Sequence, residues 1–159
     1  MIFRIGHGYD AHRMADKETL ILGGVNIPYE RGLIGHSDAD VLTHALIDAL
    51  FGAAAMGDIG SHFPDTAEEY RNISSLKLLK ATAQKLSEKG YEIINADITV
   101  LAQKPKLSPY IVRMRENIAG ILKTDIRNIS IKATTEEKMG FTGSGEGIAV
   151  HAVVLLMRK

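Results

Sequence analysis

The sequence predicts an α+β fold: a mixed four-stranded sheet, a small hairpin beside it, and three helices on one face of the sheet. Strand-like segments alternate apolar and polar residues or are apolar throughout, whereas three other segments repeat apolar residues at helical spacing. Their order along the chain is strand, hairpin, two helices, strand, helix, two strands. The 159 residues have the usual size of one domain, and we expect a single domain over residues 1–159.

The first strand is expected over residues 2–12. Its two faces are Ile5, His7, Tyr9 and Ala11 on one side, and Gly6, Gly8, Asp10 and His12 on the other. Glycine is unusual inside a strand, so Gly6 and Gly8 indicate close approach of another backbone or of a ligand. Residues 13–19 are polar and predict a surface loop. A tight hairpin follows over residues 20–27, because Gly-Gly at 23–24 suits the primed turns.

The first helix is expected to begin at Ser37 or Asp38, either of which can cap it, and to run to about residue 55. Beside its apolar face, Asp40, His44 and Asp48 lie four residues apart and form a polar stripe. Such a stripe is a poor choice for packing but suits a metal ligand and the groups that orient it. Residues 56–66 are too rich in Gly, Pro and Asp for a regular element.

The remaining elements follow from the same patterns. A second helix over residues 74–89 ends at Gly90, and a strand alternates over residues 91–102. The third helix begins with Ser108-Pro109 and runs to about residue 123. Strands over residues 129–134 and 148–157 flank a Gly-rich loop at 140–147. The last strand is apolar on both faces, and no helix remains for the second face, so we expect copies of this chain to cover it in a homo-oligomer.

The overall composition excludes several kinds of function. Nineteen basic and nineteen acidic residues give a formal net charge of zero, so we expect no nucleic-acid partner. The absence of cysteine leaves His, Asp and Glu as metal ligands and excludes a cysteine nucleophile. No apolar run approaches a membrane span and no signal peptide is evident, so a cytoplasmic protein without membrane contact is expected.

The strongest chemical pattern joins the first strand to the first helix. Asp10 and His12 share a strand face, and His44 adds a second imidazole. Zinc accepts this ligand set, and three protein ligands leave a fourth position open, as in catalytic sites. Two other interpretations are a surface acid and imidazole with no metal, and the two-His-one-carboxylate set of non-haem iron oxygenases. The helix stripe favours the metal, and the small number of strands argues against an oxygenase.

Other segments carry weaker signals. Thr134, Thr135 and Glu136-Glu137 follow a strand and suit phosphate oxygens and a hard cation, or a solvated turn. Residues 104–108 lead into a helix and offer backbone N–H groups to an anion or a base. Asp58 and Asp65 suit either substrate hydroxyls or turn capping. The glycines at 143–147 precede a strand, which argues against a dinucleotide-binding loop.

Long motifs in this chain resemble the 2-C-methyl-D-erythritol 2,4-cyclodiphosphate synthase family. The resemblance covers essentially the whole chain and rests on five segments, which are residues 5–12 (IGHGYDAH), 35–44 (GHSDADVLTH), 57–60 (GDIG), 63–66 (FPDT) and 132–143 (KATTEEKMGFTG). It implies a phosphorus-oxygen lyase of non-mevalonate isoprenoid biosynthesis. In that reaction the 2-phosphate of 4-diphosphocytidyl-2-C-methyl-D-erythritol 2-phosphate attacks the β-phosphorus of its own diphosphate, and CMP leaves.

The resemblance also implies roles for single residues. Zinc is held by Asp10, His12 and His44, Mg²⁺ or Mn²⁺ on the diphosphate is held by Glu137, and His36 and Thr135 stabilise the transition state. The implied substrate contacts are Asp10, His12, His36, Ser37, Asp58, Ile59, Gly60, Phe63, Asp65, Ala102, Lys104, Pro105, Lys106, Leu107, Ser108, Thr134, Thr135, Glu137 and Phe141. On this interpretation, Gly6 and Gly8 give the diphosphate room beside the metal.

The family resemblance further implies a homotrimer with sheets packed inside and active sites between neighbouring subunits. Some members carry Arg after the Phe-Thr-Gly run, facing a cavity that holds isoprenoid diphosphates. Here that position is Ser144, which lacks the charge. Two other functions stay open at this point: a zinc phosphohydrolase of nucleotide diphosphates, whose nucleophile is zinc-bound water, and a non-catalytic trimer that binds isoprenoid diphosphates.

Overall fold

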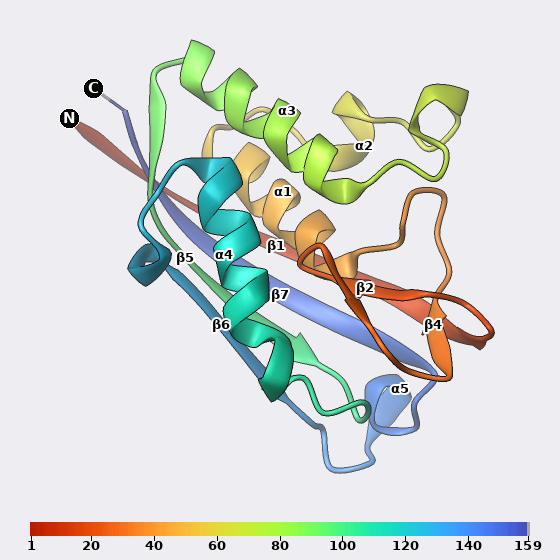
Figure 1. The fold of residues 1–159 in the computed structure, drawn as a ribbon. Helices are drawn as coiled ribbons and strands as arrows, with labels where there is room; N and C mark the ends of the chain where they lie inside the picture. Colours follow the sequence, from red (N-terminus) through yellow and green to blue (C-terminus); the bar gives the residue numbers. More distant parts are fainter. Residues whose placement is uncertain (159) are drawn as a thin grey trace.

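The structure, a computed structural model, describes residues 1–158, in which one sheet carries three long helices on a single face (Figure 1). Its strand order is β4-β1-β7-β5-β6. These strands are β1 (Ile2–Asp16), β4 (Arg31–Leu33), β5 (Tyr91–Leu101), β6 (Ile129–Thr134) and β7 (Gly147–Arg158). The separate hairpin is β2 (Leu20–Leu22) and β3 (Val25–Ile27). The helices are α1 (Val41–Ala53), α2 (Ile59–His62), α3 (Ser75–Glu88), α4 (Ile111–Leu122) and α5 (Gly140–Gly143).

The first and last strands form the centre of the sheet. β1 pairs with β7 in antiparallel register from Ile2 opposite Arg158 to Arg13 opposite Gly147, so both ends of the chain lie at one edge of the molecule (Figure 1). β7 also pairs antiparallel with β5, whereas β5 and β6 run parallel. The sheet is therefore mixed, as predicted.

The predicted faces of β1 are confirmed, and its glycines have a structural cause. A Cβ built on Gly6 would lie 1.9 Å from the carbonyl oxygen of Ala49, and one built on Gly8 would lie 1.9 Å from that of Ala45. The backbone of α1 thus lies directly on β1, in the space that any side chain would fill. The interpretation that these glycines give a diphosphate room is wrong, because α1 occupies that space.

Asp40 caps α1, which begins at Val41, so the predicted cap at Ser37 or Asp38 lies two or three residues too early. The fully buried Asp40 carboxylate accepts hydrogen bonds from four groups: the backbone N–H groups of Gly23, Gly24 and Thr43, and the Thr43 hydroxyl, at 2.8–3.0 Å. It therefore ties the hairpin turn to the helix. Asp40 is part of this structural anchor and not of an open polar stripe with His44.

The sheet contains one more strand than predicted within residues 1–158. β1 continues through residues 13–16, which were expected to form a loop, because Met14, Ala15 and Asp16 pair with β4. β4 is only three residues long with Gly32 at its centre, so it has no alternation to recognise. The two irregular segments at 56–66 and 140–147 each contain a four-residue helix, α2 and α5.

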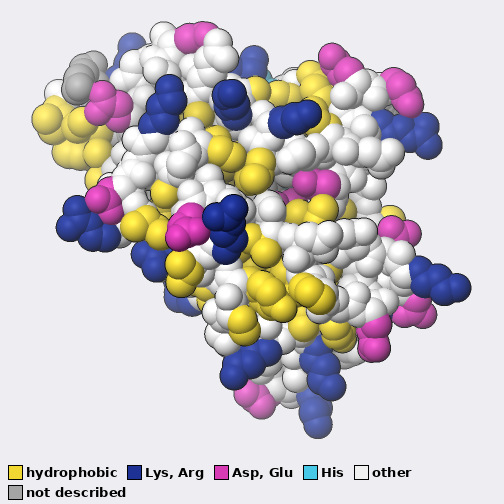
Figure 2. All heavy atoms as spheres, in the orientation of Figure 1, with side chains coloured by type: hydrophobic (Ala, Val, Ile, Leu, Met, Phe, Trp, Pro, Cys, Tyr) yellow, Lys and Arg dark blue, Asp and Glu magenta, His cyan; other side chains and the backbone are white. Residues whose placement is uncertain are grey.

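The two faces of the sheet differ in their cover. Alternate residues of β7, such as Val150, Ala152 and Val154, are buried beneath the helices. On the open face Phe3, Ile5 and Val153 are 57%, 76% and 44% exposed. The helix-bearing face shows charged side chains of both signs, with hydrophobic side chains visible between the helices (Figure 2). Among residues 1–158, no helix is both long and apolar enough to cross a bilayer.

Replacing Gly8 with Ala should destabilise the protein by about 3 kcal/mol or more, because the new Cβ overlaps the α1 backbone, which cannot yield without moving the helix. Gly120→Ala is the control. A Cβ there meets no atom within 4 Å, and alanine in a helix interior should stabilise by about 0.5–1 kcal/mol. Urea unfolding monitored by circular dichroism measures both, and equal stability of the two variants would contradict the packing argument.

Candidate metal centre and substrate pocket

Asp10, His12 and His44 converge on the helix side of the sheet, as predicted. β1 directs Asp10 and His12 to the same face, and the close approach of α1 brings its first turn, with His44, onto them. Asp10 Oδ2 lies 3.0 Å from His12 Nε2 and 3.3 Å from His44 Nδ1, and the two nitrogens lie 3.3 Å apart. Within residues 1–158, these three side chains are the acidic and imidazole groups that lie close enough together to hold one metal ion.

The spacing of these three atoms fits zinc. For zinc bonds of about 2.05 Å, donor atoms 3.3 Å apart subtend about 107° at the metal and atoms 3.0 Å apart about 94°. These angles suit a distorted tetrahedron with three protein ligands and one open position. The Ile34 carbonyl, 2.8 Å from His12 Nδ1, accepts the proton of that nitrogen and leaves Nε2 free to ligate.

The three groups also alter one another's protonation. Burial raises the pKa of Asp10, but hydrogen bonds and charges from His12 and His44 outweigh it and bring the pKa down to about 2. Burial lowers the pKa of His12, and the Asp10 carboxylate more than compensates, so that the pKa lies above its ordinary value. A positive charge between these groups is therefore favoured, and a proton and a metal ion compete for the same ligand atoms.

A hollow of about 430 Å³ adjoins the metal ligands. Of the predicted substrate residues, the ones that line it are His12, His36, Ser37, Ile59, Gly60, Phe63 and Asp65. The zinc ligand His44 and Gly35, Pro64, Tyr70 and Leu78 complete the lining. The His36 Nε2–H donates to the Ala67 carbonyl at 3.2 Å. The half-buried Asp48 carboxylate accepts the Ile59 N–H at 2.7 Å, which links the metal-bearing helix to the loop at 56–66.

Asp58 lies outside this lining. Its carboxylate caps α2 by accepting the N–H and hydroxyl of Ser61, and these hydrogen bonds lower its pKa. Turn capping, one of the two roles considered for Asp58, is therefore present in the structure.

The second half of the predicted site gathers elsewhere. Because β5 and β6 are parallel, their carboxyl ends meet at one edge, where the Ala102 N–H donates to the Thr134 carbonyl at 3.1 Å. The Thr135 hydroxyl lies 3.4 Å from Glu137 Oε1. Besides Asp10 and Asp58, the predicted residues that do not line the hollow are Ala102, Lys104, Pro105, Lys106, Leu107, Ser108, Thr134, Thr135, Glu137 and Phe141. The chain thus brings the predicted site together as two separate groups.

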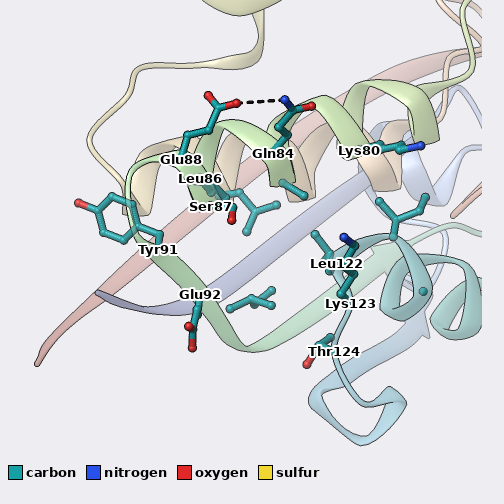
Figure 3. Close-up of a pocket in the computed structure, with 15 residues that line it drawn as sticks. Lys80, Gln84, Leu86, Ser87, Glu88, Tyr91, Glu92, Leu122, Lys123 and Thr124 are labelled. Carbon is teal, nitrogen blue, oxygen red and sulfur yellow. Dashed lines mark hydrogen bonds between the residues drawn. The ribbon is translucent and has the colours of Figure 1, made fainter. Parts of the chain in front are cut away.

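A larger groove of about 890 Å³ lies between the C-terminal halves of α3 and α4 and the start of β5 (Figure 3). Lys80, Glu88 and Lys123 are among the charged residues that line it, over apolar side chains such as Leu86 and Leu122. None of the predicted site residues lines this groove. The groove shares no lining residue with the hollow beside the metal ligands, so the two are separate features.

Sequence reasoning did not identify Asp38 and Ser75, whose side chains lie behind His44. Ser75 Oγ is 2.8 Å from His44 Nε2 and also bonds the Asp38 carboxylate. The two residues are 37 positions apart on different elements, so no spacing pattern connects them. Only their types and places, a serine at the start of the second predicted helix and an acid expected to cap the first, hinted at capping.

Comparison with known proteins agrees with this geometry. The family model described as "YgbB family" matches residues 3–157. The 2-C-methyl-D-erythritol 2,4-cyclodiphosphate synthase of Desulfitobacterium hafniense (strain DSM 10664 / DCB-2) is 57% identical over 157 residues, which cover 99% of each chain. The solved structure described as the bifunctional IspDF from Campylobacter jejuni superimposes with a TM-score of 0.95 at 46% identity. The match covers 99% of this chain, which spans 43% of that longer one.

A Plasmodium falciparum structure, described as IspF in complex with CDP, superimposes with a TM-score of 0.86 at 36% identity, covering 99% of this chain and 97% of that one. Sequence, fold and metal-ligand geometry therefore agree. The chain belongs to the YgbB family, that of the 2-C-methyl-D-erythritol 2,4-cyclodiphosphate synthases.

Proposed function

We propose that this protein is a single-domain 2-C-methyl-D-erythritol 2,4-cyclodiphosphate synthase, a lyase of non-mevalonate isoprenoid biosynthesis. Its substrate is 4-diphosphocytidyl-2-C-methyl-D-erythritol 2-phosphate. A 2-phosphate oxygen forms a bond to the β-phosphorus, the bond from that phosphorus to the CMP oxygen breaks, and CMP leaves as the ring closes. The observation that carries the proposal is the Asp10–His12–His44 centre with an open position beside the 430 Å³ hollow.

The reaction needs little acid–base chemistry, because the attacking phosphate is already an anion. The demand is to neutralise crowded phosphate oxygens and to align attack with departure. Asp10, His12 and His44 would hold zinc and Glu137 would hold Mg²⁺ or Mn²⁺, and these ions would supply positive charge to the diphosphate. His36 and Thr135 would stabilise the oxygens on which negative charge grows.

The substrate-binding roles follow the two groups of residues. Ser37, Ile59, Gly60, Phe63 and Asp65 hold the erythritol part in the hollow, with Asp58 at its border. Residues 102–108 hold the cytosine largely through backbone groups, and residues 134–137 with Phe141 approach the diphosphate.

The separation of these groups supports a homotrimer with shared active sites. In one chain the hollow is lined by the zinc ligands His12 and His44 but not by residues 102–108 or 134–137. The open sheet face carries exposed Phe3, Ile5 and Val153, which need apolar cover. Three copies packed sheet to sheet bury this face and let one chain's second group complete its neighbour's hollow. We also retain the cytoplasmic location expected from the sequence.

A zinc phosphohydrolase is the second candidate, since an open metal position also suits an activated water. Incubation with the diphosphocytidyl substrate, zinc and magnesium in ¹⁸O-labelled water separates the two. A cyclase releases CMP and unlabelled cyclic product in equal amounts. Open-chain product carrying ¹⁸O would identify a hydrolase and contradict the proposal.

Removing a metal ligand should abolish both zinc and turnover. His44→Ala and Asp10→Ala are expected to purify with little zinc and to lose more than about 100-fold in activity, beyond the loss typical of a group that only orients a ligand. Asp125→Ala is the control, because this carboxylate pairs with Arg127 on the surface, far from the ligands in sequence. Metal analysis and an assay of CMP release measure the two effects. A wild type that binds isoprenoid diphosphates but shows no turnover would instead favour the non-catalytic binding protein.

Zinc affinity should fall as the pH is lowered. Zinc binds neutral imidazole, and the pKa of His12 is raised, so protons compete already at a pH above the ordinary histidine pKa. The dissociation constant should rise at least about tenfold per pH unit below that pKa. Asp10, with a pKa of about 2, stays ionised and adds nothing. Chelator competition between about pH 5.5 and 8 tests this, and a constant affinity would refute it.

A charge on the open sheet face should break the trimer. Ile5→Asp is expected to give monomers in sedimentation and to lose at least about tenfold in turnover, while each chain keeps its zinc, since its three ligands come from one chain. Val112→Asp places the same charge at an exposed apolar residue of α4, and should remain trimeric and active. A fully active Ile5→Asp monomer would show that one chain suffices.

A further inference from the structure

Both ring nitrogens of His44 are engaged by neighbouring groups. Nδ1 faces Asp10 and His12, whereas Nε2 lies 2.8 Å from Ser75 Oγ and 3.0 Å from Ser37 Oγ. Ser75 is the first residue of α3 and is fully buried. Its hydroxyl also bonds Asp38 Oδ1, and its backbone N–H donates to Asp38 Oδ2 at 3.0 Å.

The proton of the Ser75 hydroxyl determines which His44 nitrogen is protonated. A hydroxyl has one proton to donate, and a carboxylate accepts only. The proton therefore goes to Asp38, since otherwise two acceptors would be in close contact. Ser75 Oγ then presents a lone pair to His44, so Nε2 must carry a hydrogen, and the neutral ring keeps on Nδ1 the lone pair that a metal ion beside Asp10 and His12 would take.

Ser37 is compatible with the same arrangement. Its oxygen accepts the Ala39 N–H at 3.3 Å and shares the His44 Nε2–H. The Ser37 proton is then available to an acceptor in the hollow that this residue lines.

We propose that Asp38 and Ser75 are positioning residues that hold His44 in its Nε2–H tautomer and fix the ring so that Nδ1 is the metal ligand. The arrangement also couples the metal centre to α3. The Asp38 N–H donates to the Ile73 carbonyl at 3.0 Å, and the Asn72 N–H donates to the His36 carbonyl at 2.8 Å. The start of α3 is therefore joined to the segment that leads into α1.

The first experiment measures zinc affinity by chelator competition. Ser75→Ala should raise the dissociation constant about 10- to 100-fold, the usual effect of losing a group that orients a ligand. Asp38→Asn, which removes the charge that holds the Ser75 proton, should raise it about tenfold. Ser75→Thr keeps the hydroxyl and should restore affinity to near wild type. Ser74→Ala is the matched control, because the Ser74 side chain makes no capping hydrogen bond, and should change nothing.

The second experiment reads the tautomer directly from the ¹⁵N shifts of His44 in the zinc-loaded protein. We expect Nε2–H in the wild type and in Ser75→Thr, and a mixture of tautomers in Ser75→Ala. Nδ1–H in the wild type, or wild-type zinc affinity in a folded Ser75→Ala protein, would overturn the inference.

The zinc part rests on the proposed function, but both readouts are made without substrate. If the His44 ring carries its proton on Nε2 but no cyclic product forms, the proposed function is rejected and the positioning role stands. If cyclic product forms but the proton lies on Nδ1, the positioning role is rejected and the function stands.

Discussion

The direct contact between the backbones of β1 and α1 is the constraint on which the rest of the structure depends. Gly6 and Gly8 leave no side chain between strand and helix, so the carbonyl groups of Ala45 and Ala49 occupy the positions where Cβ atoms would be. At ordinary helix–sheet spacing, a residue of the first helical turn would be too far from the strand to share an ion with it. The two glycines thus determine the geometry of the metal centre although neither touches it.

Much of this could be predicted from the sequence, because the determining patterns are local. Alternation in β1 and helical spacing in α1 place Asp10, His12 and His44 on facing surfaces, and the three residues do converge. The limits of β6 were predicted correctly, and those of α3 to within one residue at each end, because Gly90 with a φ of +76° provides a clear stop.

What could not be predicted depends on contacts between distant segments. β4 exists because residues 14–16 offer it a free edge, not because its own three residues favour a strand. Asp40 lies four residues before His44, which is the spacing expected of a polar stripe. Its carboxylate nevertheless accepts hydrogen bonds from the backbone N–H groups of the hairpin turn. The Asp38–Ser75 pair likewise needs α3 to pack beside α1. In each case the partner lies far along the chain, where no periodicity reports it.

Pairing of β1 with β7 has a consequence for how this domain folds. Ile2 lies opposite Arg158, so the central pair of the sheet joins segments that most of the described sequence separates. Until β7 lies beside it, β1 lacks its main hydrogen-bonding neighbour. Contacts that span nearly the whole chain slow folding, because the loop must close before they can form. Pairing of β7 with β1 therefore closes a loop that contains the other long elements of the sheet and its helices, and we expect this step to limit the rate of folding.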